Sequence, residues 1–182
     1  MPNLKNSMWR TIIAFNLVCV LAAQVSYANE RVSLGDGRVS FVPPAGFKAW
    51  TKEQIGAKYL RGNPPQYVFA NKTGAVTVAV TFSPGKVAPE QLPEFKTALE
   101  QMLPRMIPGL QWIAREFVTI NGRKWLHLEM TSHALDTDIH NHVCATSFAG
   151  KALIFGFNST IENYPKMKEG LLNSAQTITV RD

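Results

Sequence analysis

The sequence predicts an α+β fold in which helices flank a mainly antiparallel sheet. Two observations indicate this class. Tight turns such as Asn121-Gly122 join segments of alternating polarity, which is the pattern of hairpins between neighbouring antiparallel strands. Segments with helical periodicity separate groups of strands rather than following every strand, so the order is not that of repeated βαβ units. The 182 residues contain no internal repeat and no long linker, so one folded domain is expected.

Residues 1–28 have the pattern of a cleavable signal peptide. The only charges in this segment, Lys5 and Arg10, precede an apolar run over residues 11–23. The run is shorter than the roughly 20 residues of a membrane span. Small residues occupy the −3 and −1 positions of a cleavage site at the end of the segment. We therefore expect residues 29–182 to be exported as a single domain, periplasmic or secreted, with no transmembrane segment after cleavage.

Charge and cysteine content narrow the function classes. The chain has 19 basic and 13 acidic residues, a formal net charge of +6, but its basic residues are scattered and form no block. A nucleic-acid footprint requires a clustered basic face, so no nucleic-acid partner is expected. Cys144 is the only cysteine after residue 28, so no internal disulfide is expected and the apolar core must stabilise the domain.

In the first half of the chain, alternation and turn residues predict a hairpin, a short helix and a second hairpin, over residues 31–42, 51–60 and 66–82. Asp36 between two glycines forms the first turn, and Pro43-Pro44 ends the strand that follows it. Thr51 and Gln54 have the spacing of a capping box at the start of the helix. The last strand of the second hairpin has one apolar face, formed by Val76, Val78, Val80 and Phe82.

In the second half, a helix, four strands and a final helix are predicted, over residues 89–103, 111–120, 123–131, 138–148, 151–159 and 163–176. The first helix begins at Pro89 or Pro93 and is expected to end at Pro104. It has apolar residues at helical spacing, which we assign to the core: Leu92, Phe95, Leu99 and Met102. Residues 132–137 form a polar loop. Residues 177–180 form a short extended end, after a helix whose one side carries Met167, Leu171 and Ala175.

Five segments together resemble a known superfamily. They are the strand over residues 39–47 ending in Pro-x-Gly-aromatic, the strand at 76–82, the helix near 90–103, the Asn121-Gly122 hairpin and the strand-to-helix ending at 155–176. In these segments the chain resembles the PsbP-like superfamily, which includes the DcrB-like bacterial envelope proteins. The resemblance implies an α/β/α sandwich around an antiparallel sheet. It also implies a binding, adaptor or assembly protein rather than an enzyme, and it carries over no catalytic residue.

The side chains that can bind a metal or exchange protons are concentrated on the strands at 123–131 and 138–148 and on the loop between them. The set includes all four histidines of the chain. Its members are His127, Glu129, His133, Asp136, Asp138, His140, His142 and Cys144. We expect Ser132 to pair with Ile139, because that register collects an apolar face from Leu126, Leu128, Met130, Val143 and Ala145. The opposite face then pairs His127 with Cys144, Glu129 with His142 and Thr131 with His140.

This register suggests a zinc or copper site formed by His127, His140, His142 and Cys144. Glu129 or Asp138 would supply a further ligand. Imidazole nitrogen and thiolate are the ligands that these metals prefer. Two other interpretations stay open. In one, the histidines face solvent without a partner and Cys144 is a half-buried hydrophobe. In the other, the clustered histidines sense protons near pH 6 to 7.

The sequence as a whole predicts an exported, non-enzymatic binding or assembly (adaptor) protein of the cell envelope. We expect no cofactor, and an envelope protein or a lipid surface as the partner. The sequence contains no Gly-x-Ser-x-Gly elbow, no phosphate-binding loop and no His-Glu-x-x-His helix. The first alternative is a periplasmic zinc- or copper-binding protein that uses the His-x-His-x-Cys strand. The second is a hydrolase, which would need a pocket with a base beside a nucleophile.

Overall fold

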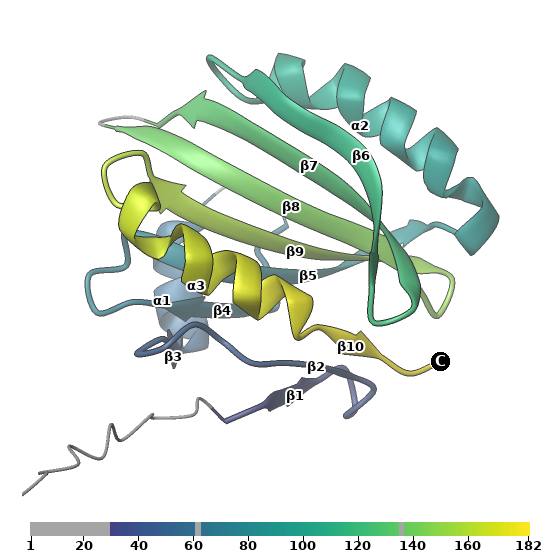
Figure 1. Cartoon of the computed structure of the whole chain (residues 1–182), viewed down its shortest axis with the longest axis horizontal. Helices are drawn as coiled ribbons and strands as arrows, with labels where there is room; N and C mark the ends of the chain where they lie inside the picture. The colour runs from purple at the N-terminus through teal and green to yellow at the C-terminus, as the bar shows by residue number, and fades with distance from the viewer. Residues whose placement is uncertain (1–29, 61–62, 135–136) are drawn as a thin grey trace, which may run out of the picture.

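The structure is a computed structural model that describes residues 30–60, 63–134 and 137–182 (Figure 1). The expected signal peptide lies outside these ranges. The strands are β1 (Val32–Leu34), β2 (Val39–Phe41), β3 (Lys48–Ala49), β4 (Tyr67–Ala70), β5 (Val76–Lys86), β6 (Gln111–Ile120), β7 (Arg123–His133), β8 (Asp138–Phe148), β9 (Lys151–Thr160) and β10 (Thr179–Val180). The helices are α1 (Lys52–Lys58), the short 3-10 helix η1 (Pro89–Gln91), α2 (Leu92–Met106) and α3 (Tyr164–Gln176). No helix within the described ranges has the length and apolar character needed to cross a membrane.

Seven strands form one antiparallel sheet in the order β3-β4-β5-β9-β8-β7-β6. A separate three-stranded sheet has the order β1-β2-β10, so the end of the chain pairs with the first hairpin. At the predicted turn between β6 and β7, Asn121 and Gly122 have positive φ angles of 48° and 79°, as a two-residue hairpin turn requires. The Asn121 side chain donates hydrogen bonds to the carbonyl oxygens of Gln176 and Ile178, which fixes the C-terminal segment against this turn.

A helix covers each face of the large sheet (Figure 1). On one face, Leu99 of α2 packs against apolar residues of β7 and β8, namely Leu126, Leu128, Met130 and Ala145. On the other face, Leu171 and Ala175 of α3 pack into a larger core that includes Trp125, Phe155 and Phe157. The predicted α+β class and its α/β/α arrangement are therefore confirmed.

The predicted register of β7 and β8 is confirmed, since Ser132 lies opposite Ile139 and Glu129 lies opposite His142. The interpretation in which the strand histidines face solvent is wrong for His140 and His142. His140 and His142 are only 8% and 5% exposed, because α3 covers that face of the sheet (Figure 1). Periodicity in the sequence shows that this helix has an apolar side, but not which face of the sheet that side covers.

Three predicted boundaries are wrong. β5 continues past residue 82, where the sequence predicts its end, to Lys86, which pairs with Lys151 after a register shift. α2 continues past Pro104 to Met106, because a proline in the last turn removes only one helical hydrogen bond. β7 extends to His133, so the loop that follows is shorter than predicted.

The apolar stripe of α2 is narrower than predicted. Leu92 and Leu99 are buried, whereas Met102 is 45% exposed. Three residues turn about 300° around a helix, so Met102 lies at the edge of the stripe centred on Leu99. The capping box of α1 is confirmed, since the Thr51 and Gln54 side chains each bond to the other residue's backbone N–H.

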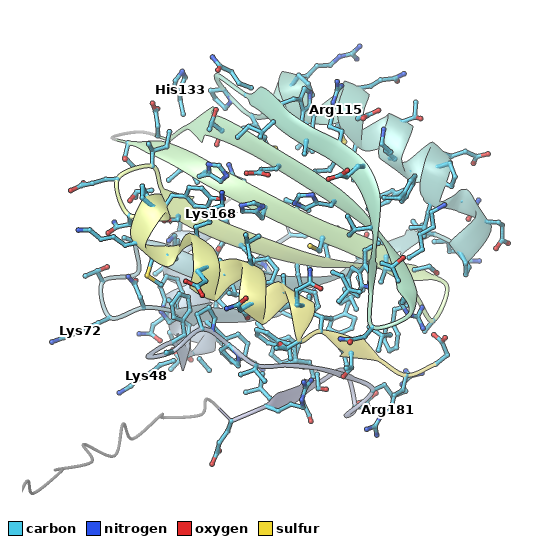
Figure 2. The ribbon with its side chains drawn as sticks, viewed as in Figure 1. Lys48, Lys72, Arg115, His133, Lys168 and Arg181 are labelled. Carbon is cyan, nitrogen blue, oxygen red and sulfur yellow. The ribbon has the colours of Figure 1, made fainter. Side chains whose placement is uncertain are left out.

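Basic side chains point outward on different sides of the molecule. Figure 2 shows this for Lys48 in β3, Lys72 in the turn before β5, Arg115 in β6, Lys168 in α3 and Arg181 at the C-terminal end. These five residues therefore form no single basic face, which agrees with the scattered distribution of basic residues in the sequence.

Candidate functional site

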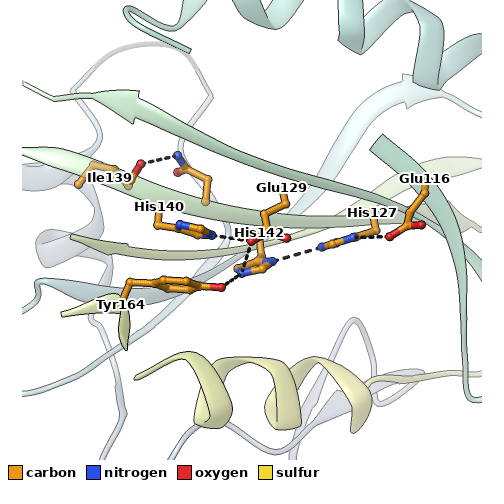
Figure 3. A network of polar contacts seen from close by, with 8 residues as sticks. Glu116, His127, Glu129, Ile139, His140, His142 and Tyr164 are labelled. Atoms are coloured by element: carbon orange, nitrogen blue, oxygen red, sulfur yellow. Dashed lines mark hydrogen bonds and ion pairs between the residues drawn. The ribbon is translucent and has the colours of Figure 1, made fainter. Parts of the chain in front are cut away.

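A row of polar side chains crosses the sheet beneath α3 (Figure 3). β7 contributes His127 and Glu129, and β8 contributes His140 and His142. Residues two apart on a strand share a face, and the antiparallel register brings the two pairs side by side. Tyr164, at the first turn of α3, reaches the row from the helix (Figure 3). We call these five residues the histidine row.

His142 is at the centre of the histidine row and has a partner on each ring nitrogen. Its Nδ1 lies 3.2 Å from Nε2 of His127, and its Nε2 lies 2.6 Å from the Tyr164 hydroxyl. The same Nε2 lies 3.5 Å from Oε1 of Glu129. A neutral imidazole donates from one nitrogen and accepts at the other, so these partners hold the ring of His142 in one orientation.

The other members of the row are held in the same way. Nε2 of His140 lies 2.8 Å from Oε1 of Glu129 and donates to it. The His140 ring stacks on Tyr164 with a centroid separation of 3.5 Å and an interplanar angle of 10°. At the opposite end of the row, Nδ1 of His127 lies 3.7 Å from Oε1 of Glu116 on β6. Contacts therefore run without a break from β6 to α3.

Burial sets the protonation of His142 and Tyr164 at neutral pH. Burial lowers the pKa of His142 to about 4; the Glu129 carboxylate opposes this change, while the neighbouring histidines and Lys168 add to it. Burial, together with the Glu129 carboxylate, raises the pKa of Tyr164 to about 12. At neutral pH His142 is therefore a neutral imidazole, which accepts a hydrogen bond at one ring nitrogen, and Tyr164 is a phenol.

The row brings together a different set of metal ligands from the one predicted. One ligand atom from each of His127, Glu129 and His142 lies within 4.8 Å of the other two. His140 is outside this group and instead donates to Glu129. Cys144 is also outside it, although the register places it opposite His127. Cys144 is packed in the apolar core, and burial raises its pKa to about 12, which disfavours the thiolate that a metal needs.

Two further members of the predicted cluster lie away from the row. His133 and Asp138 face each other next to the loop that joins β7 and β8, and their side chains are 59% and 52% exposed. Figure 2 places His133 at the outer edge of the molecule. Asp136 lies outside the described residues. His133 is therefore a histidine of the same hairpin that takes no part in the row.

A pocket of about 210 Å³ opens between the sheet and α3, next to the histidine row. Its walls are mainly apolar and come from β6, β9 and α3: Val118, Ile120, Phe157, Leu171, Leu172 and Ala175. His127, His142 and Cys144 also line it, and Glu116 and Gln176 complete the lining. The pocket therefore joins an apolar space to imidazole rings that carry hydrogen-bonding nitrogen atoms.

Two residues of the site were missed by sequence reasoning. Glu116 had a usable signal, because counting outward from the Asn121-Gly122 turn pairs Glu116 with His127, and the structure has this pairing. Tyr164 had none. No local pattern shows which strand residues the first turn of a distant helix will contact.

No family model and no curated protein matches this sequence. Solved structures do match it. The solution structure of PsbP (CyanoP) from Synechocystis sp. PCC 6803 is 17% identical, with a TM-score of 0.55 over 87% of this chain and 96% of its own. The crystal structure of LpqN, involved in cell envelope biogenesis of Mycobacterium tuberculosis, is 12% identical, with a TM-score of 0.56 over 84% of this chain and 90% of its own. The chain has a PsbP-like fold.

The PsbP-like fold extends to proteins whose function is not known. PA94 of Pseudomonas aeruginosa, described as a putative regulator, is 12% identical, with a TM-score of 0.52 over 84% of this chain and 97% of its own. The resemblance expected from the sequence is thus confirmed for the fold. At such identities the likeness establishes the PsbP-like fold alone and assigns no role to any side chain.

Proposed function

We propose that this PsbP-like protein is an exported, non-enzymatic binding or assembly protein of the cell envelope. Its pocket between the sheet and α3 receives an apolar side chain of a partner envelope protein. The observation that carries the proposal is the pocket itself, an apolar recess of about 210 Å³ lined by His127 and His142 on one side. Pockets for drug-sized ligands usually have about 300–1,000 Å³, so this one suits a single large side chain better than a cofactor.

The rim of the pocket supports a protein partner. Leu172 of α3 is 37% exposed at the pocket, and Glu116 and Gln176 are exposed polar residues of the same lining. An apolar centre with a polar edge is the usual arrangement of a protein–protein interface. At such interfaces, a few anchors that fill pockets supply most of the binding energy.

The state of Cys144 supports binding rather than catalysis. A cysteine nucleophile reacts as the thiolate, whereas burial raises the pKa of Cys144 to about 12. The ring nitrogens of His142, which lines the same pocket, are engaged with His127 and Tyr164. His142 is therefore not placed as a base for this thiol, as a cysteine hydrolase would require.

Export is supported by the signal-peptide pattern of residues 1–28. We expect the mature protein to begin at Asn29. Intact-mass analysis of the protein from its own cells tests this, and a chain that retains residues 1–28 would contradict it. The envelope as the location agrees with LpqN, which shares the fold and is involved in cell envelope biogenesis.

A photo-crosslinking experiment tests the pocket. p-Benzoylphenylalanine replaces Leu172 at the rim, and intact cells are irradiated before the adducts are identified by mass spectrometry. We expect a defined adduct with an envelope protein, and its loss when Val118→Phe fills the pocket. The matched control is Thr119→Phe, which adds the same ring to an exposed position on the other face of β6. An adduct that persists in Val118→Phe would contradict the proposal.

A further inference from the structure

We propose that His127, Glu129 and His142 form a binding site for one zinc or copper(II) ion beneath α3. This site adjoins the pocket, since His127 and His142 also line it, but metal binding by these residues does not depend on the proposed partner. It also differs from the four-residue set expected from the sequence, since Glu129 takes the place of His140 and Cys144. The argument rests on ligand convergence, on the spacing of the two imidazoles and on the contacts behind each ligand.

The strands hold the three ligands together before any metal binds. Glu129 lies directly opposite His142, and His127 is two residues before Glu129 on the same face of β7. One ligand atom from each residue lies within 4.8 Å of the others. Because both strands are central in a regular antiparallel ladder, only small side-chain rotations separate this arrangement from coordination of one ion.

The two imidazoles already have the spacing of ligands to one metal. Nε2 of His127 and Nδ1 of His142 are 3.2 Å apart. Zinc–nitrogen bonds are about 2.0–2.1 Å, so two nitrogen atoms on a tetrahedral zinc ion are about 3.3 Å apart. An ion that replaces the proton shared between these atoms therefore needs little change in their separation, and each ring turns so that its nitrogen faces the ion.

Each ligand also has a partner that orients it. Nε2 of His142 contacts the Tyr164 hydroxyl at 2.6 Å, which leaves Nδ1 directed toward His127. Nδ1 of His127 faces the Glu116 carboxylate at 3.7 Å. His140 donates to Glu129 at 2.8 Å. Carboxylate or other polar partners behind histidine ligands are the usual outer shell of zinc sites.

The ligand types select the metal class. Two imidazoles and one carboxylate suit zinc or copper(II), whereas calcium and magnesium prefer oxygen ligands alone. Three protein ligands leave a fourth position for water or another group. His127 and His142 also line the pocket, so access to that position is from the pocket side.

Calorimetric titration of the chelator-treated exported protein with zinc chloride, and separately with copper(II) sulfate, tests the site. We expect one ion per chain for at least one of the two metals. Glu129→Gln and His127→Ala should each weaken binding at least about tenfold. Cys144→Ala and the exposed-histidine control His133→Ala should bind as the wild type does. Circular dichroism and thermal melting of each metal-free variant separate loss of a ligand from loss of the fold.

The outcomes are distinct. Cobalt(II) substitution that gives a spectrum without a thiolate charge-transfer band supports nitrogen and oxygen ligation, and one with that band overturns the ligand set. Absence of stoichiometric zinc and copper binding overturns the site, as does equal weakening by His133→Ala. Glu129 does not line the pocket, so Glu129→Gln should lose the metal but keep the crosslink at position 172, and the two proposals can fail separately.

Discussion

The two faces of the β7–β8 pair differ, although one helix covers each. Beneath α2 the face is hydrocarbon, and it packs on Leu99 through Leu126, Leu128, Met130 and Ala145. Beneath α3 alternate positions of the same strands carry His127, Glu129, His140 and His142. Buried polar groups cost free energy unless they are hydrogen-bonded, and well-packed apolar residues often stabilise a core as well or better. Apolar burial stabilises the α2 face, whereas the α3 face holds polar side chains that satisfy one another and converge as candidate metal ligands.

The largest expected effect on stability comes from the α2 face. Leu128 is fully buried, so Leu128→Ala should lower the free energy of unfolding by about 2–5 kcal/mol, through lost burial and a residual cavity. Urea unfolding measures this loss, and Leu128→Met, which conserves volume, should cost less than about 1.5 kcal/mol. Where Leu128→Ala still folds, it should bind zinc or copper as the wild type does. A loss of metal affinity equal to that of His127→Ala would remove the distinction between the two faces.

The next effect is a pH dependence that belongs to the α3 face. Burial lowers the pKa of His142 from 6.5 to about 4 in the folded protein. As the pH falls through this interval, the unfolded chain binds the proton first, so the free energy of unfolding decreases. The free energy of unfolding is lower by about 2–3 kcal/mol at pH 4, and this loss is fully recovered above about pH 6.5.

Urea unfolding of the metal-free protein between pH 4 and 7 measures this dependence. The groups that face His142 are His127, Glu129, His140, Lys168 and Tyr164. His142→Gln should remove the His142 part of the slope, whereas His133→Ala should leave it unchanged. Identical slopes for the wild type and His142→Gln would show that His142 is not buried as a neutral imidazole.

A smaller effect is expected where α3 meets the row. Tyr164→Phe removes the 2.6 Å hydrogen bond to His142 but keeps the ring that stacks on His140. We expect a loss of about 1 kcal/mol in the free energy of unfolding. Thermal melting compares Tyr164→Phe, which loses only the hydroxyl, with Tyr164→Leu, which loses both the hydroxyl and the stacked ring. A hydroxyl that contributes nothing in Tyr164→Phe would contradict the orienting contact.

The smallest effect is expected at the end of α2. Met102 is 45% exposed, so Met102→Gln should change the free energy of unfolding by less than about 0.5 kcal/mol. Leu99→Gln, one turn earlier and buried, serves as the contrasting variant in the same urea titration. Similar losses of unfolding free energy in both variants would show that Met102 belongs to the buried apolar stripe, as the sequence predicts.

Regular local patterns explain what the sequence predicted correctly. Turn residues such as Asn121-Gly122 fix strand ends, and the alternation from Leu126 to Met130 fixes the register of β7 and β8, because a slip would expose the apolar face. The three expected helices and the first hairpin follow from the same kind of evidence.

The predictions that failed concern contacts between segments that are distant in the sequence. The sequence does not show which face α3 covers, so the burial of His140 and His142 was missed. Opposed Cβ positions also do not determine where side-chain atoms meet. The short side chain of Cys144 stays in the core, whereas the longer Glu129 reaches His142, and this changes the candidate ligand set.

Elemental analysis of the protein, purified from its own cells without chelator or affinity tag, tests the central claim most directly. That claim is that the α3 face of the sheet carries a metal site and the α2 face does not. We expect about one zinc or copper ion per chain, lost in Glu129→Gln and retained in His133→Ala. A metal-free protein whose melting temperature does not change with added zinc or copper would contradict the claim.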